Sequence, residues 1–342
     1  MAKTADGRPT IHDVAQEAGV SYQTVSRVIN NSPKVASKTR ARVLDAIRKL
    51  DYRPIQAARN LSSRRSYTIQ ILAFNWNHYS LQSIVSTANA AGFQTSVIYL
   101  KRHDPEELRA SLAHMASQLI DGSILIAMPF EMDYAGLLKL SRGIPCVQIG
   151  GVLNRGVPYI GYEQATASRM AAEHLIGLGH RCIAEISGSA IYPAGPVRHE
   201  AFLETLAAAG LRPGRCIESD WTARGGYAAA RELLANGTPT GKPDFSALIC
   251  GNDLIAQGAM RAVHEHGLRI PDDISVAGFD DIDEAAFFIP PLTTVRQDFD
   301  ALGALSVEYL LSLIDRPDTP TQQRMLFPEL IVRRSTAPPP AS

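Results

Sequence analysis

Residues 10–30 constrain the fold of this chain more than any other stretch, because they predict two short helices joined by a tight turn. Thr10 and Asp13 have the spacing of a capping box, which marks the start of a first helix. Gly19 can adopt the left-handed conformation that ends this helix, and Ser21 can cap a second one. Apolar residues recur at helical spacing in both segments: Ile11, Val14, Ala15, Ala18, Val25, Val28 and Ile29. The stretch therefore predicts a helical hairpin with one buried face.

The other face of the second helix carries long polar side chains near its N-terminus: Tyr22, Gln23, Ser26 and Arg27. A recognition helix needs such a face to reach base edges in the major groove of DNA. The alternative is a helical hairpin whose polar face is only solvated. A third helix is expected from Ser37 to Leu50, capped by Ser37. Its apolar residues would complete a three-helix core: Val43, Leu44, Ala46, Ile47 and Leu50.

The distribution of charge favours the DNA-binding interpretation. Residues 1–66 contain 13 Lys and Arg against 5 Asp and Glu, a net charge of +8. The whole chain contains 34 of each, so the remainder has 21 against 29, a net charge of −8. A basic head on an acidic body is expected if only the head meets phosphates.

Three motifs run almost without a break from Thr10 to Leu61: V-A-x-x-A-G-V-S-x-x-T-V-S-R-V-I-N, V-x-x-K-T-R-x-R-V and L-x-Y-x-P. They resemble the headpiece of the LacI/GalR repressors, in which Tyr22 and Gln23 fall on base-reading positions. The resemblance implies a homodimer that binds double-stranded operator DNA. It assigns DNA contacts to Thr10, Ser21, Tyr22, Gln23, Thr24, Ser26, Arg27, Asn30, Lys34, Thr39, Tyr52, Ala58, Arg59 and Leu61.

A linker is expected to connect the head to the body, with the helix-turn-helix headpiece at 1–53 and a hinge helix or linker at 54–66. The segment 55–61 is long enough for two helical turns, which are marginal in water, so a flexible tether is the alternative. The resemblance implies that paired hinge helices insert a leucine into the minor groove. Leu61 occupies that position, and an apolar wedge between base steps kinks DNA.

Beyond Tyr67 short apolar runs alternate with helical stretches. Strands are predicted at 69–74, 95–100, 123–128, 145–149, 159–162, 182–187, 247–250 and 274–278. Helices are predicted at 83–91, 105–118, 134–141, 165–178, 197–209, 223–235, 254–266 and 301–314. This α/β alternation predicts parallel sheets covered by helices on both faces, and the number of strands favours two lobes.

The resemblance implies that the two lobes form a periplasmic-binding-protein-like body that closes around an effector. The body is expected at 67–335, as an effector-binding and dimerisation domain. Lobe 1 is predicted at about 67–161 and 292–322, lobe 2 at about 162–291 and 323–335, and a disordered tail at 336–342.

Candidate effector ligands follow the predicted strands of lobe 2, where open α/β sheets bind ligands. Arg198, Asn252 and Asp280 supply planar donors and acceptors, and Trp221 an aromatic face, which together suit a sugar. Singly, each such residue is more often structural, for example as a helix cap. The resemblance assigns effector contacts to Phe74, Trp76, Gly150, Arg198, Trp221, Asn252, Asp280, Gln297 and Phe299. Phe74, Ala127 and Gly150 replace polar residues of the family pattern, which argues against a galactoside.

Other classes of protein have little support. The first nine residues are polar and no run approaches about 18 apolar residues, so a cytoplasmic protein without a membrane span is expected. The four cysteines contain no C-x-x-C pair and the histidines no metal spacing, so neither a metal nor a cofactor is predicted. No Walker, G-x-G-x-x-G, G-x-S-x-G or H-E-x-x-H motif suggests an enzyme.

The sequence thus predicts a transcriptional repressor that a small sugar or glycoside releases from a palindromic operator. One alternative is a regulator that needs a purine-like corepressor. A soluble sugar-binding transport protein and a sugar-processing enzyme are further alternatives, which the basic head and the missing catalytic motifs disfavour. Three consecutive prolines after Val332, and no leucine heptad, favour a dimer over a tetramer.

Overall fold

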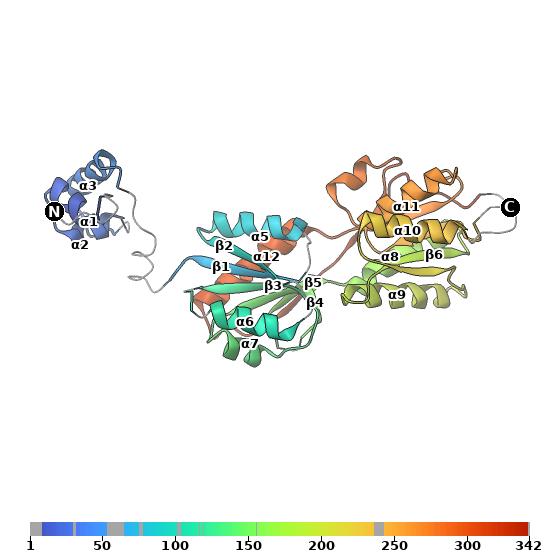
Figure 1. The fold of residues 1–342 in the computed structure, drawn as a ribbon, viewed down its shortest axis with the longest axis horizontal. Helices are drawn as coiled ribbons and strands as arrows, with labels where there is room; N and C mark the ends of the chain where they lie inside the picture. The colour runs from blue at the N-terminus through green and yellow to red at the C-terminus, as the bar shows by residue number, and fades with distance from the viewer. Residues whose placement is uncertain are drawn as a thin grey trace. The chain divides into compact units, whose positions relative to one another are not determined.

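The computed structural model describes residues 9–29, 32–52, 65–74, 78–100, 104–115, 117–118, 120–154, 156–235 and 243–340. The chain forms two compact units, Met1–Ser66 and Tyr67–Ser342 (Figure 1). Five residues predicted to contact DNA or effector lie outside the described residues: Asn30, Ala58, Arg59, Leu61 and Trp76.

The first unit contains the predicted helical hairpin. Its helices are α1 (Ile11–Ala18), α2 (Tyr22–Ile29) and α3 (Ser37–Lys49). The Thr10 amide donates to Asp13 Oδ2 at 2.7 Å and the Asp13 amide donates to Thr10 Oγ1 at 3.3 Å, which confirms the capping box. Gly19 ends α1 with a φ of 61°, and Ser21 Oγ accepts from the Thr24 amide. The turn is therefore built by local bonds that the sequence predicts.

The three helices pack around a small apolar core of Val14, Val25, Val28 and Val43. Two expectations for α3 are wrong. Ala36 occupies the N-cap and makes no side-chain cap bond, so Ser37 is already inside the helix. Leu44 is 46% exposed, because one residue turns a helix by about 100° from the buried Val43.

The second unit contains two six-stranded sheets, one in each lobe. The first has the order β11-β5-β4-β3-β1-β2 and the second the order β12-β10-β9-β8-β6-β7. The first comprises β1 (Thr68–Ala73), β2 (Gln94–Tyr99), β3 (Gly122–Met128), β4 (Cys146–Gly151), β5 (Tyr159–Tyr162) and β11 (Gln323–Leu326). The second comprises β6 (Ile183–Gly188), β7 (Cys216–Ser219), β8 (Ala247–Cys250), β9 (Ser275–Asp280), β10 (Thr293–Arg296) and β12 (Glu329–Ile331). Among the described ladders β10–β12 is antiparallel and the others are parallel.

Helices cover both faces of each sheet, which confirms the predicted α/β architecture (Figure 1). On the first sheet, α5 (His78–Ala90) and α12 (Phe299–Asp315) pack on one face, and α6 (Pro105–Met115) and α7 (Tyr134–Leu140) on the other. On the second, α10 (Ala223–Ala235) and α11 (Asp253–Glu265) pack opposite α8 (Gln164–Gly177) and α9 (Ala194–Ala208). A 3-10 turn, η1 (Asp283–Phe287), follows β9. Among the described helices none is long and apolar enough to cross a bilayer.

The chain crosses between the lobes at other points than predicted. Strands β10, β11 and β12 were not predicted, because each begins or ends on polar or charged residues and so forms no continuous apolar run. β10 pairs with β9, so residues 293–296 belong to the second lobe rather than the first. β11 pairs with β5, so residues 323–326 belong to the first lobe rather than the second.

The C-terminal segment is ordered where a disordered tail was predicted. The Ala337 amide donates to Ser275 Oγ at 3.0 Å, and the Ala337 carbonyl lies 2.9 Å from His180 Nε2. The Ser335 hydroxyl donates to the Val276 carbonyl at 2.6 Å. These bonds hold the segment against β9, whereas residues 341–342 lie outside the described part.

Candidate functional site

The carboxyl ends of the strands in the second lobe bring several predicted effector ligands together. Asp280 is the last residue of β9, and Gln297 follows β10, its neighbour in the sheet. Arg198 reaches the same edge from α9, the helix that follows β6. Because these strands are parallel, their ends meet at one edge, as the sequence predicts.

Arg198 is the centre of this cluster. It is 7% exposed, and its guanidinium lies 3.4 Å from the ring centroid of Phe279. Nη1 donates to the Gly251 carbonyl at 2.5 Å, and Nε donates to Gln164 Oε1 at 2.8 Å. Nη2 lies 3.9 Å from Asp280 Oδ1. The protein thus orients two of the guanidinium nitrogens and leaves the third facing a carboxylate at the limit of an ion pair.

Asp280 is held by a short bond and perturbed by burial. Gln297 Nε2 donates to its Oδ1 at 2.6 Å. Burial raises the pKa of Asp280 to about 6, against the opposing effects of Arg198 and the Gln297 bond. Burial likewise lowers the pKa of Arg198 to about 10, although Asp280 opposes this shift. Both shifts show that loss of hydration outweighs the attraction between the two charges.

Trp221 lies directly above a glycine at the end of β6. A Cβ on Gly188 would lie 2.1 Å from the Trp221 ring, so only glycine permits this packing. Trp221 Nε1 donates to the Ser189 carbonyl at 3.3 Å, and the ring centroid lies 5.4 Å from the Arg198 guanidinium. The indole is therefore fixed next to the polar cluster.

Asn252 has a positioning role in this structure. It is the N-cap of α11, where its Oδ1 accepts from the Ile255 amide at 2.8 Å. Its Nδ2 donates to the Trp221 carbonyl at 3.2 Å. Because the protein engages both ends of the amide, Asn252 holds the tryptophan loop against the start of α11.

The predicted effector ligands of the first lobe lie in three different environments. Phe74 is 5% exposed and packs edge-on against Phe130 at 5.5 Å, so its ring belongs to the core. Phe299 stacks on Tyr79 with ring centroids 5.7 Å apart. Gly150 has a φ of 57°, and a Cβ there would have open space around it. Of these three positions, Gly150 alone leaves room for a ligand next to the backbone.

Gln164 was missed by sequence reasoning although it completes the cluster. It is the first residue of α8, shortly after β5, and its Oε1 accepts a hydrogen bond from Arg198 Nε. Its Nε2 lies 3.3 Å from Gln297 Oε1. Its place after a strand end was the available signal, but no local pattern distinguishes it from an ordinary first residue of a helix.

In the head, α2 presents the predicted base-reading side chains to solvent. Tyr22, Gln23 and Arg27 are exposed, and the Tyr22 ring lies 5.4 Å from that of His12. Ser26 is half-buried on the same helix, and Lys34 is exposed in the turn that follows. The remaining predicted contacts are partly used by the fold or half-buried: Thr10, Ser21, Thr24, Thr39 and Tyr52.

Comparison with known proteins places both units in one family. The profile of "Bacterial regulatory proteins, lacI family" matches residues 10–54, and a "Periplasmic binding protein-like domain" matches residues 172–336. The lactose operon repressor of Escherichia coli (strain K12) is 33% identical over 332 residues, which cover 96% of this chain and 90% of that protein. The chain belongs to the LacI family. It therefore combines a DNA-binding head with an effector-binding body, as other members of the family do.

Further relatives include a second repressor and two solved structures with bound small molecules. The HTH-type transcriptional repressor PurR of Erwinia tasmaniensis is 34% identical over 339 residues, covering 97% of this chain and 98% of that protein. The solved lac repressor dimer bound to operator and the anti-inducer ONPF superposes with a TM-score of 0.86 at 31% identity, over 96% of this chain and 99% of that one. A CelR–cellobiose complex superposes with a TM-score of 0.69 at 31% identity, over 96% of this chain and all of that one. The lactose operon repressor and PurR are thus about equally similar to this chain.

Proposed function

We propose that this protein is a homodimeric repressor that binds a palindromic operator and is released by a small sugar or glycoside. The observation that carries the choice of ligand is the pairing of Arg198 with Asp280 beside Trp221. A ring hydroxyl can accept from a guanidinium and donate to a carboxylate, and the 3.9 Å between Nη2 and Oδ1 places one of each on the same side of the cluster.

The aromatic residues near Arg198 also support a sugar. A sugar needs one aromatic surface for its C–H face, and Trp221 is held next to the polar cluster by Gly188 and Ser189. A purine would gain from rings on both of its faces. Phe74 does not supply the second ring in this structure, because it packs into the core of the first lobe.

A purine-like corepressor is the second candidate, because PurR repressors are as similar to this chain as the lactose operon repressor is. The two proposals differ in the sign of the ligand effect. An inducer favours the lobe arrangement that releases DNA, whereas a corepressor favours the arrangement that binds it.

A ligand-dependent gel shift distinguishes the two candidates. The operator is first selected from random DNA with the full-length protein, and the complex is then titrated with mono- and disaccharides and with purine bases. Release by a saccharide is expected. Tighter operator binding with a purine base, and no response to any saccharide, would contradict the sugar proposal.

The proposed homodimer has a surface that suits it. Phe287 and Ile289 are 83% and 94% exposed after β9, next to a groove of about 370 Å³ lined by Met260, His264 and Phe288. Exposed apolar side chains that lie together beside a groove suit an association surface. The solved lac repressor is described as a dimer on its operator.

The hinge proposal concerns Leu61 and its neighbours Ala58 and Arg59, which fall outside the described residues. The proposed role is to pair with the second copy on DNA and to wedge the leucine into the minor groove. In this proposal the protein acts in the cytoplasm, where its DNA target lies, and has no catalytic role.

A further inference from the structure

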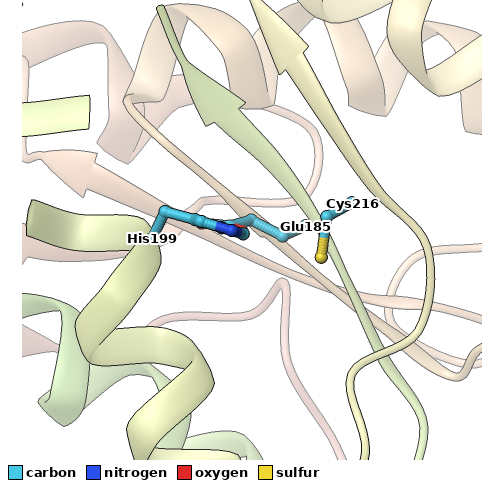
Figure 2. Close-up of side chains that lie close together, drawn as sticks. All are labelled: Glu185, His199 and Cys216. Atoms are coloured by element: carbon cyan, nitrogen blue, oxygen red, sulfur yellow. The ribbon is translucent and has the colours of Figure 1, made fainter. Parts of the chain in front are cut away.

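Three side chains that can bind a metal lie together in the second lobe, from elements that are far apart in sequence. Glu185 is on β6, His199 on α9 and Cys216 at the start of β7. Figure 2 shows His199 reaching from its helix toward Glu185, with Cys216 on the neighbouring strand. One ligand atom from each residue lies within 4.8 Å of the other two.

The sheet register explains this convergence. Glu185 and Cys216 are direct partners in the parallel ladder between β6 and β7, so their side chains lie on the same face of the sheet. Ile183, two residues before Glu185, packs in the same core cluster as Phe202 of α9. Glu185 therefore points to the face that α9 covers, and His199 is on that helix.

The burial of Glu185 needs a compensating partner. The residue is 2% exposed on a face that is otherwise apolar, and a carboxylate there is costly unless it is paired or coordinates a metal. His199 Nδ1 makes a short hydrogen bond with Glu185 Oε2, and this bond raises the pKa of His199.

We propose that Glu185, His199 and Cys216 form a binding site for zinc or a similar borderline divalent cation, with water in the fourth position. At the usual zinc–ligand distances, tetrahedral ligands lie roughly 3.3–3.8 Å apart. Because Glu185 and His199 share a short hydrogen bond, an ion must replace this bond, and the three ligand atoms must rearrange by about 1 Å to hold it. A set of one nitrogen, one oxygen and one sulfur suits zinc, whereas magnesium and calcium prefer oxygen ligands.

Solvent reaches the site from the edge of the sheet. β7 is the last strand of its sheet, Cys216 is exposed, and the His199 side chain is 34% exposed. An ion held there joins β6, β7 and α9. α9 also carries Arg198, and β7 leads into the loop of Trp221. A filled site is therefore expected to stabilise the lobe that holds the effector ligands.

Metal titration of the full-length protein tests this site. The protein is stripped with a chelator, kept reduced, and titrated with zinc, cobalt and magnesium. We expect one zinc per chain by calorimetry, a thiolate-to-cobalt charge-transfer band in the near ultraviolet, and a higher unfolding temperature with zinc but not with magnesium. The cobalt band reports a sulfur ligand directly and does not depend on DNA or effector binding.

Three variants assign the ligands. Cys216→Ser should abolish the cobalt band and weaken zinc binding by more than about tenfold, since even changes outside the ligand shell cost that much. Because Cys216 is exposed, this variant is expected to fold even if Glu185→Gln does not. His199→Gln should weaken zinc binding similarly. The matched control, Cys182→Ser, alters a half-buried thiol just before β6 and should retain both signals. An unchanged cobalt band in Cys216→Ser, or no binding to the wild type, would overturn the proposal.

Discussion

The side chains of Arg198 and Asp280 are both little exposed, yet they make only a loose ion pair with each other. The protein binds Arg198 Nε and Nη1 through Gln164 and Gly251, but Nη2 reaches Asp280 only at 3.9 Å. The low exposure of both groups raises the strength of any bond they form and the cost of leaving one unpaired. The pair is thus where the effector response should be most sensitive to substitution.

Replacing Arg198 should remove the response to effector and spare DNA binding. Arg198→Ala is expected to bind operator normally and to need about 5- to 150-fold more inducer, which corresponds to roughly 1–3 kcal/mol. The measurement is inducer titration of operator release by fluorescence anisotropy. Arg215→Ala, which alters an exposed arginine paired with Glu232, serves as the control. A wild-type inducer response in Arg198→Ala would show that the effector binds elsewhere.

Asp253 is completely buried at the start of α11. Asn252 caps α11, while the carboxylate of Asp253 accepts from the Ile282 amide at 3.0 Å and from Thr294 Oγ1 at 2.6 Å. Burial, with a further contribution from Asp280, raises its pKa from 3.8 to about 8. The folded protein therefore keeps a proton on Asp253 that the unfolded chain loses.

This proton predicts a specific pH dependence of stability. Because the folded-state pKa is raised, the contribution of Asp253 to the free energy of unfolding falls as the pH rises from about 4 to about 8. Asp253→Asn should lack this component, and urea unfolding of both proteins across that range measures the difference. Asp253→Ala should lose about 1–3 kcal/mol, because it leaves the Ile282 amide unpaired. Parallel pH profiles of the wild type and Asp253→Asn would contradict the raised pKa.

Among the helices, α2 carries the exposed side chain of Gln23 near its N-terminus. If Gln23 contacts a base, Gln23→Ala should weaken the preference for one base at one operator position by about 1–3 kcal/mol. Lys34→Ala provides the comparison, since loss of a phosphate contact weakens binding to all sequences equally. Binding to a panel of single-base operator variants separates the two patterns. Equal loss of affinity for all operator variants in Gln23→Ala would show that Gln23 does not read a base.

The proposed hinge helix contains Leu61, which lies outside the described residues. Leu61→Ala should lower operator affinity and reduce DNA bending, because no apolar wedge would unstack a base step. Circular-permutation gel assays measure the bend. Leu44→Ala, which truncates an exposed leucine of α3, is the matched control and should bend DNA normally. An unchanged DNA bend with Leu61→Ala would show that residues 54–66 act only as a tether.

At the scale of the molecule, the exposed apolar side chains after β9 predict a dimer of the body. Ile289→Glu should dissociate this dimer, because it places a charge where an apolar side chain would be buried. Val332→Glu is the control, since Val332 is 57% exposed and does not line that groove. Light scattering should give the mass of two chains for the wild type and the control. A four-chain mass, or a dimer of Ile289→Glu, would contradict this prediction.

The features that depend on neighbouring residues could be predicted from the amino-acid sequence. The capping box at Thr10, the left-handed Gly19 and the apolar spacing of α1 and α2 act within a few residues, so the helical hairpin could be predicted closely. The alternation of long strands and helices was equally clear. The cluster around Arg198 could be predicted in part. Arg198 follows β6 and Asp280 ends β9, which are parallel strands of one sheet, so the ends of these strands meet at one edge.

The residues that share an environment across distant segments became known only from the folded chain. Strand pairing placed β10 and β11 in the opposite lobes from those predicted, and packing turned Phe74 into the core. The role of Gln164 and the cluster of Glu185, His199 and Cys216 depend on sheet register and on which helix covers which face. Local sequence carries no record of these contacts, because burial and pairing between distant segments are fixed by the whole fold.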